Sequence, residues 1–154
     1  MGSYFLDTSA IVKRYFPEQG HTWVVTLCDP EQAHSLYISQ AALVEVVATV
    51  CRKAREQSIA DEERDALIKR FRQDSQNAYI IWPVTIAIYT AAGDLCRSHR
   101  LRAYDAVQLA CVLGLRDEAA ASEAPFPIFV CADNNLSAIV ATEGLSAENP
   151  TDYP

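Results

Sequence analysis

The sequence predicts an α/β fold with a mostly parallel central sheet flanked by helices. Short apolar segments of strand length alternate along the chain with longer segments of helical pattern, which is typical of βαβ units. The chain has 154 residues, of which 50% are hydrophobic and 21% charged, and this suffices for the core of one domain. We therefore expect a single domain over residues 1–147, followed by a short C-terminal tail over residues 148–154.

Four short apolar segments are predicted to form the strands. They are rich in aromatic and aliphatic residues, and Pro125 and Pro127 bracket the entry to the last of them. Because parallel strands need long crossover connections, the segments between them should be helical. The predicted strands are residues 3–6, 35–39, 79–84 and 128–132.

Helical patterns fill these connections, and several of their ends carry recognisable signals. Pro17 ends the first helix and Gly144 stops the last, while Asp61 and Glu62 mark a new helix start after a break near Ser58. The residues after Ala147 read as turns. The predicted helices run from about 9 to 17, 20 to 27, 40 to 58, 58 to 76, 85 to 98, 103 to 120 and 136 to 143.

The composition argues against several classes of protein. No apolar run approaches the roughly 18 residues of a membrane span, and a strand pattern begins almost at once, so we expect neither a membrane segment nor a signal peptide. The five cysteines form no C-x-x-C pair and the three histidines show no ligand spacing, so we expect neither set to take part in the chemistry. This cysteine usage is typical of the reducing cytoplasm.

The net charge of −7 argues against long-range attraction to nucleic acid. Basic residues gather instead in local clusters, such as Lys13 and Arg14, and we expect most of these clusters to be solvated helix faces. The cluster from Arg97 to Arg102 ends three residues before Asp105, so it could place positive charge beside that carboxylate.

Four acidic residues abut or interrupt strongly apolar segments. Asp7 and Asp133 each follow a predicted strand, Glu45 divides an apolar helix, and Asp105 precedes another. A buried, ionised carboxylate costs several kcal/mol unless a positive group compensates it. Four such residues in one chain suggest that they converge on a shared cation. A ligand set made only of carboxylate oxygens suits Mg²⁺ or Mn²⁺.

The predicted elements would bring the four acids to one place. Asp7 and Asp133 lie at the carboxyl ends of two strands, the edge at which open parallel sheets bind ligands. Glu45 and Asp105 lie early in helices and could point toward the same edge. A metal ion held there would activate a water and neutralise charge on a phosphodiester, and a carboxylate with a raised pKa could accept the proton.

Each acid alone also has a structural interpretation. Asp7 could cap a turn, Asp105 could favour a helix dipole, and Asp133 could belong to an ordinary turn. Glu45 is the hardest to explain in this way, because its neighbours on every helical face are apolar and no lysine or arginine lies one turn away. Taken together, the four favour a shared metal ion over coincidence.

Several polar and aromatic residues near these acids could support the site. Thr8 and Ser9 could orient Asp7 or hold a phosphate, although capping is an equal role for Ser9. Asn135 could supply a carbonyl oxygen or simply form a turn. Tyr104 and Tyr15 could stack on an unpaired base, or they could be core aromatics with a polar tip.

Three segments of the chain and Glu45 resemble the motifs of a known family. Residues 4–13 (YFLDTSAIVK) are similar to the opening of PIN domains, particularly the toxin ribonucleases of the VapC type. Residues 101–110 (LRAYDAVQLA) resemble their central acidic motif, and residues 129–136 (FVCADNNL) resemble their last one. Glu45 fits their helical acid. The four motifs occur in the family's order and spacing over residues 3–144.

The resemblance implies a PIN-like three-layer fold and a Mg²⁺- or Mn²⁺-dependent endoribonuclease that cleaves RNA, usually as a homodimer in the cytoplasm. It also implies an antitoxin partner whose peptide covers the acidic site. Carried over by position, Asp7, Glu45, Asp105 and Asp133 are the catalytic and metal-binding residues. Independently of the resemblance, the place of Arg102 and Tyr104 just before Asp105 makes them candidates for supporting the site or contacting the substrate. Some relatives have a further acid where this chain has Asn135, so one or two metal ions both remain possible.

Two other functions compete with this interpretation. A PIN module that has lost catalysis could bind RNA or protein without cleavage, although the four intact acids count against it. A phosphatase or phosphoacceptor domain also uses an aspartate at the end of its first strand. Haloacid-type phosphatases require a second aspartate two residues after the first, and this chain has Ser9 there.

Overall fold

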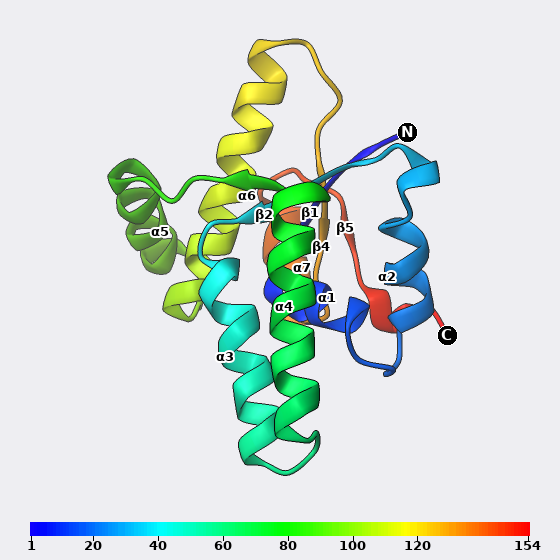
Figure 1. The fold of residues 1–154 in the computed structure, drawn as a ribbon. Helices are drawn as coiled ribbons and strands as arrows, with labels where there is room; N and C mark the ends of the chain where they lie inside the picture. Colours follow the sequence, from blue (N-terminus) through cyan, green and yellow to red (C-terminus); the bar gives the residue numbers. More distant parts are fainter.

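A five-stranded, wholly parallel sheet organises the chain (Figure 1). The computed structural model describes all 154 residues. The strand order is β3-β2-β1-β4-β5, so β1 lies at the centre with β2 and β4 on either side. The strands are β1 (Ser3–Leu6), β2 (Ser35–Ser39), β3 (Ile80–Trp82), β4 (Ile128–Val130) and β5 (Ala147–Glu148).

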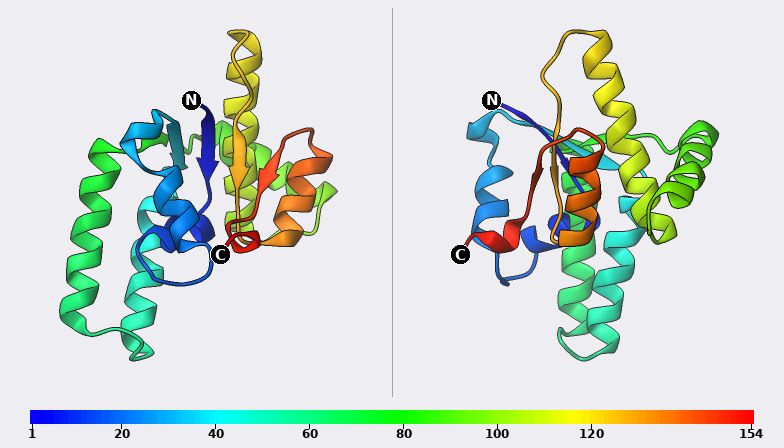
Figure 2. Two further views of the ribbon diagram at one scale, coloured as in Figure 1. Left: turned by 90° about the vertical axis from the view of Figure 1, so that its right-hand side faces the viewer. Right: turned by 180° about the vertical axis from the view of Figure 1, so that it is seen from behind.

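Helices cover both faces of this sheet, which gives the three layers of an α/β fold (Figure 2). One face carries the first four helices and the other carries the last three. None of them combines the length and hydropathy that crossing a membrane would require. The helices are α1 (Thr8–Ile11), α2 (His21–Leu27), α3 (Ala42–Arg55), α4 (Asp61–Asn77), α5 (Ile86–Ser98), α6 (Ala103–Ala121) and α7 (Asn134–Thr142).

Alternation along the strands divides the core into two parts. Leu6 and Ile38 point into a cluster formed with the helices from α1 to α4, while Phe5 and Phe129 point into a cluster formed with α5, α6 and α7. The rings of Phe5 and Phe129 stack with their centroids 6.0 Å apart. Because side chains on a strand alternate between faces, the two clusters pack against opposite faces of the sheet at β1.

The parallel register places the carboxyl ends of β1 and β4 side by side. Phe5 lies opposite Phe129, and the backbone N–H of Asp7 donates to the carbonyl of Val130 at 3.0 Å. Only Asp7 separates β1 from α1, and three residues, the last of them Asp133, separate β4 from α7. This sheet edge therefore carries two of the four acids identified in the sequence.

The predicted fold class is confirmed, and the strand and helix predictions hold with shifts of a few residues at their ends. The helix predicted from about residue 9 to Pro17 is divided into α1 and a 3-10 turn over Val12–Arg14. The residues after Ala147 were expected to form turns, and this expectation is corrected. Ala147 and Glu148 form β5, and Pro150–Asp152 forms a 3-10 helix. A two-residue strand carries no local pattern, since only its pairing with β4 defines it.

The C-terminal residues pack against the loop and helix that follow α1. The rings of Trp23 and Tyr153 stack with a centroid distance of 4.8 Å, and the side-chain amide of Gln19 donates to the carbonyl of Thr151 at 2.7 Å. Gly20 begins α2 with φ of +85°, close against Pro150. Residues 148–154 are therefore built into the fold through β5 and α2.

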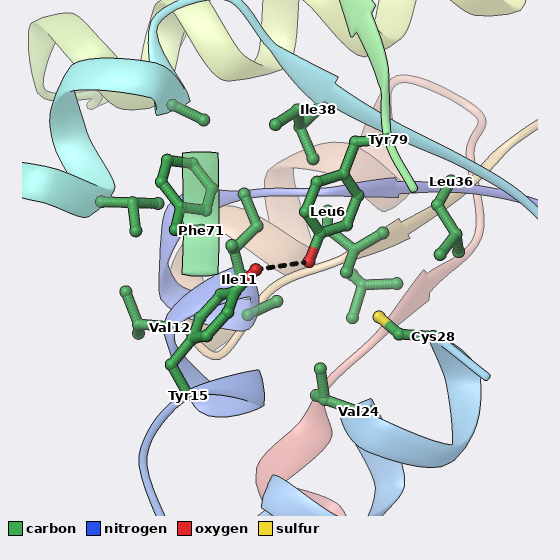
Figure 3. Close-up of a cluster of buried hydrophobic side chains, with 14 of the residues drawn as sticks. Leu6, Ile11, Val12, Tyr15, Val24, Cys28, Leu36, Ile38, Phe71 and Tyr79 are labelled. Carbon is green, nitrogen blue, oxygen red and sulfur yellow. Dashed lines mark hydrogen bonds between the residues drawn. The ribbon is translucent and has the colours of Figure 1, made fainter. Parts of the chain in front are cut away.

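A buried polar cluster joins the first helical segment to α4 and the start of β3. Arg14 donates to the hydroxyl of Tyr79 at 2.9 Å and lies 3.5 Å from Asp74. Tyr15 donates to Asp74 at 2.7 Å, and its hydroxyl lies 3.3 Å from that of Tyr79 (Figure 3). Tyr15 is only 6% exposed, so of its two predicted roles the core aromatic is the one observed.

Most basic clusters were expected to lie on solvated helix faces, and the cluster of Lys13 and Arg14 is an exception. Lys13 is 7% exposed, and its ammonium donates to Glu18 at 3.1 Å and to the carbonyl of Gln19 at 3.0 Å. The 3-10 turn rotates both side chains inward, where each finds an anionic or carbonyl partner. Burial of a lysine is tolerated because these partners replace its hydration.

Substitution of Gly20 tests the attachment of the C-terminal segment. A Cβ at this position would lie 2.4 Å from the carbonyl oxygen of Pro150, and the positive φ disfavours any L side chain. Gly20→Ala should lower the free energy of unfolding by more than about 1 kcal/mol in a urea titration.

Gly93→Ala is the matched control, because a Cβ at Gly93 in α5 meets nothing within 4 Å. Removal of a helical glycine should raise the free energy of unfolding by about 0.5–1 kcal/mol. If both variants gained stability alike, the close packing of Gly20 against Pro150 would be contradicted.

Candidate active site

Asp7 caps α1 through one carboxylate oxygen, whereas its other oxygen has a different partner. Its Oδ1 accepts hydrogen bonds from the hydroxyl of Ser9 at 2.6 Å and from the backbone N–H of Ala10 at 3.2 Å. The thiol of Cys131 donates to Oδ2 at 3.4 Å. The residue is 5% exposed, and burial raises the pKa of its carboxyl above the ordinary value, with these hydrogen bonds opposing the shift. Capping and metal binding are thus compatible roles for Asp7.

Asp133 divides its two oxygens in the same way at the start of α7. Its Oδ1 accepts from the backbone N–H groups of Asn135 at 2.8 Å and Leu136 at 3.2 Å. Its Oδ2 lies 3.9 Å from the guanidinium of Arg102. The predicted turn role of Asp133 is therefore realised as a helix cap, and its remaining oxygen faces Arg102.

Glu45 lies in the first turn of α3 and is half-buried. The side-chain amide of Gln108 donates to its Oε1 at 2.8 Å. Desolvation raises the pKa of the Glu45 carboxyl; hydrogen bonds from Gln108 and Thr8 oppose this shift, and the negative charges of Asp7 and Asp105 add to it. Glu45 is therefore electrostatically coupled to two of the other acids.

The apolar surroundings of Glu45 are only partly buried. Leu43 is 38% exposed and Val44 is 59% exposed, whereas Val46 is fully buried. The neighbours of Glu45 are apolar as the sequence shows, but one side of α3 faces solvent near its start. Glu45 lies at the boundary between that exposed side and the core.

Asp105 lies in the first turn of α6, where Arg102 contacts it. The Nε of Arg102 donates to Asp105 Oδ2 at 3.2 Å, and the same guanidinium reaches Asp133. Arg102 therefore bridges two acids that come from different helices, as its place in the basic cluster predicted. Its side chain is 84% exposed, so solvent screens both ion pairs and the guanidinium is free to move.

The side chains around this bridge line an open hollow of about 480 Å³ at the surface. Asn135 is exposed at its rim and contributes its backbone N–H to the cap of Asp133. Tyr104 is 52% exposed one residue before Asp105, and so remains available to a ligand. The hollow is lined by Arg100, Leu101, Arg102, Asp105, Asp133 and Asn135.

Thr8 and Ser9 both contact the acidic site, in different ways. The hydroxyl of Ser9 donates to Asp7 and accepts from the backbone N–H of Ala132 at 2.9 Å, so it joins the ends of β1 and β4. The hydroxyl of Thr8 accepts from the side-chain amide of Gln108 at 3.4 Å. Ser9 thus orients Asp7, and Thr8 lies on the side that faces Glu45.

The four acids lie at one sheet edge and form two groups that share Asp105. Glu45 is coupled to Asp7 and Asp105, while Asp105 and Asp133 share Arg102. No three histidine, cysteine, aspartate or glutamate side chains already form the close ligand set of a bound ion. The donors present nevertheless fit Mg²⁺ or Mn²⁺, because they are all carboxylate oxygens and the one contacting cation is held by exposed ion pairs.

Two residues of this site were not expected from the sequence. Cys131 was set aside with the other cysteines, yet its buried thiol contacts Asp7; burial and the negative charge of Asp7 raise the pKa of this thiol far above the ordinary value. Gln108 contacts Glu45 and Thr8. The only available signals were a polar residue in the apolar stretch after Asp105 and a cysteine two residues before Asp133.

Comparisons with known proteins agree with this fold. A family model described as "PIN domain" matches residues 4–124, and a search of curated proteins found no match. FitAcB from Neisseria gonorrhoeae is similar in structure, with a TM-score of 0.63 and 17% sequence identity over 96% of this chain and 97% of that chain.

Two further solved structures share the fold. VapBC2 from Rickettsia felis, bound to a DNA fragment from the promoter, gives a TM-score of 0.59 and 16% identity over 96% of this chain and 98% of that one. A toxin-antitoxin complex from Klebsiella pneumoniae gives a TM-score of 0.60 and 14% identity, with coverage of 96% and 97%. At these identities the structures establish the fold, and the family model covers most of the chain. The resemblance found in the sequence is thereby confirmed: this chain belongs to the PIN domain family.

Proposed function

We propose that this protein is a Mg²⁺- or Mn²⁺-dependent endoribonuclease and the toxin of a type II toxin–antitoxin pair. The observation that carries the proposal is the meeting of four carboxylates at the carboxyl edge of a parallel sheet. Three of them are electrostatically coupled, and an exposed arginine bridges two. Such an edge is where open parallel sheets bind ligands. The PIN family membership and the toxin–antitoxin complex of similar fold support the same assignment.

Asp7, Glu45, Asp105 and Asp133 would hold the metal ion. A bound ion of this kind supplies an activated water and neutralises charge that develops on a phosphodiester. The helix caps fix one oxygen of Asp7 and one of Asp133, so the second oxygen of each carboxylate would be the one to bind the ion. Because desolvation and its acidic neighbours raise the pKa of Glu45, this carboxylate is suited to accept a proton at the reacting centre.

Residues at the rim of the site would bind the RNA. Arg102 can leave Asp105 and Asp133 for a phosphate, because it is exposed and both ion pairs are screened. Arg97 and Arg100 are exposed beside it, and Tyr104 offers an aromatic face to an unpaired base. These local groups would attract RNA despite the net charge of −7.

Two protein partners belong to this proposal. An antitoxin peptide would cover the acidic edge, and a basic side chain of that peptide could take the place that Arg102 has here. A second copy of the chain would cover apolar side chains left exposed on α5, since Ile86 is 86% and Tyr89 58% exposed.

Metal binding should appear as thermal stabilisation that depends on Glu45. At an Mn²⁺ concentration of 100 times Kd, the ion should stabilise the wild type by about 2.7 kcal/mol, which is a Tm increase of about 5–10 °C. Glu45→Gln should respond much less, and the exposed Asp94→Asn on α5 serves as the control that responds fully.

Glu45→Gln should also change how the stability of the metal-free protein depends on pH. Because the pKa of Glu45 is raised in the folded protein, this group makes the metal-free protein less stable as pH rises from the ordinary glutamate pKa through the folded one. Glu45→Gln should therefore melt above the wild type at pH 7 and not at pH 4.

The Mn²⁺ experiment also separates the two candidate functions. If Mn²⁺ did not raise the Tm of the wild type, a module that binds RNA or protein without cleavage would be favoured.

Cleavage should depend on Asp7. Purified wild type should cut single-stranded RNA with Mn²⁺ and stop when the metal is chelated. Asp7→Asn should lower the rate at least 100-fold, because it removes an anionic ligand while keeping the cap acceptor for Ala10. Equal rates in both proteins would identify a contaminating nuclease.

Growth of a bacterial host that expresses either the wild type or Asp7→Asn tests the toxin assignment. Expression of the wild type without a partner should arrest growth, and Asp7→Asn should relieve the arrest. A harmless wild type that still cleaves RNA in vitro would leave the nuclease standing and contradict the toxin role.

Self-association should depend on the exposed side chains of α5. Sedimentation velocity should show a dimer for the wild type and a monomer for Ile86→Asp, because a buried charge opposes an apolar interface. Val25→Asp, at a 41% exposed position of α2, is the control expected to stay dimeric. A monomeric wild type at high concentration would contradict the homodimer.

A further inference from the structure

Gln108 lies inside the molecule where three elements of the acidic site meet. It is 2% exposed and lies on α6, one turn after Asp105. Its Nε2 donates to Glu45 Oε1 on α3 at 2.8 Å and to Thr8 Oγ1 on α1 at 3.4 Å. A single side-chain amide thus connects the residue next to Asp7 with the carboxylate of Glu45.

The orientation of this amide follows from the charge of Glu45. If the nitrogen and oxygen of Gln108 were exchanged, a carbonyl oxygen would face the carboxylate oxygen of Glu45, and two acceptors would repel each other. The N–H side must therefore point at Glu45. The carbonyl Oε1 is buried and accepts no hydrogen bond from any group of the protein.

This arrangement is unfavourable for a residue that serves packing alone. An apolar side chain of similar length, such as methionine, would fill the same space without burying an unpaired carbonyl. The hydrogen bond to Glu45 distinguishes glutamine from such a side chain, because it fixes the carboxylate between Asp7 and Asp105 against their repulsion. Second-sphere contacts of this kind orient the ligands of metal sites.

We propose that Gln108 is a positioning residue of the acidic site: its side-chain amide holds the carboxylate of Glu45 in place for metal binding and ties it to Thr8 beside Asp7. This inference rests on the proposed metal-dependent function and adds a residue that acts through Glu45. Gln108 itself need not touch the ion or the RNA.

The test compares Mn²⁺ affinity, measured by electron paramagnetic resonance of free Mn²⁺, in Gln108→Met and in the exposed control Gln76→Met on α4. Gln108→Met should weaken Mn²⁺ binding by about 10–100-fold with the circular dichroism spectrum unchanged. Gln76→Met should bind as the wild type does. Wild-type affinity in Gln108→Met, even with a lowered Tm, would overturn the inference and leave Gln108 a structural residue.

A second measurement needs no metal and no Gln108 variant. In the proton–nitrogen NMR spectrum of the metal-free protein, the side-chain amide protons of Gln108 should exchange slowly and lie outside the usual glutamine range. Glu45→Ala should shift them toward that range, while Asp94→Asn should not move them. Unshifted signals in Glu45→Ala would overturn the contact, even if Gln108→Met failed to fold.

The two measurements also separate this inference from the function on which it rests. A wild type that binds no Mn²⁺ would overturn the metal-dependent function and the positioning role together. Normal Mn²⁺ binding in the wild type together with normal binding in Gln108→Met would overturn the positioning role alone.

Discussion

Parallel pairing of β1 with β4 is the constraint on which the acidic site depends. The two strands come from opposite ends of the chain, yet their register places Leu6 opposite Val130, and the N–H of Asp7 extends the ladder to the carbonyl of Val130. Asp7 and Asp133 consequently leave the sheet at the same edge. The central place of β1 also lets helices from both halves of the chain reach that edge.

Each acid at this edge has a hydrogen-bonding or charged partner within the protein. Helix caps satisfy one oxygen of Asp7 and one of Asp133, Gln108 satisfies Glu45, and Arg102 lies beside Asp105. These contacts compensate only part of the charge, since the pKa values of Asp7 and Glu45 are raised in the folded protein. Desolvation is the largest cause of both shifts, and for Glu45 the negative charges of Asp7 and Asp105 add to it. Under the proposed function, a divalent cation bound at this edge would offset this cost.

The structural role observed for these residues is compatible with the functional role that we propose for them. The capping interpretation of Asp7 and Asp133 and the metal-binding interpretation looked like alternatives in the sequence, but a carboxylate has two oxygens and the structure uses them separately. Cys131 and Gln108 extend this pattern, because each contacts one of the four acids from within the core. Neither has a spacing or a neighbour in the chain that signals this contact.

The sequence by itself determined the α/β class, four of the five strands and the identity of the four acids, because these depend on local patterns of apolar and polar residues. Only the tertiary structure decided which groups surround each acid. The strand β5, the burial of Lys13 and the contacts of Cys131 and Gln108 all join segments that are distant in the chain or turned inward by a local 3-10 turn. Such contacts depend on how whole elements pack, and packing has no periodic signal along a single chain.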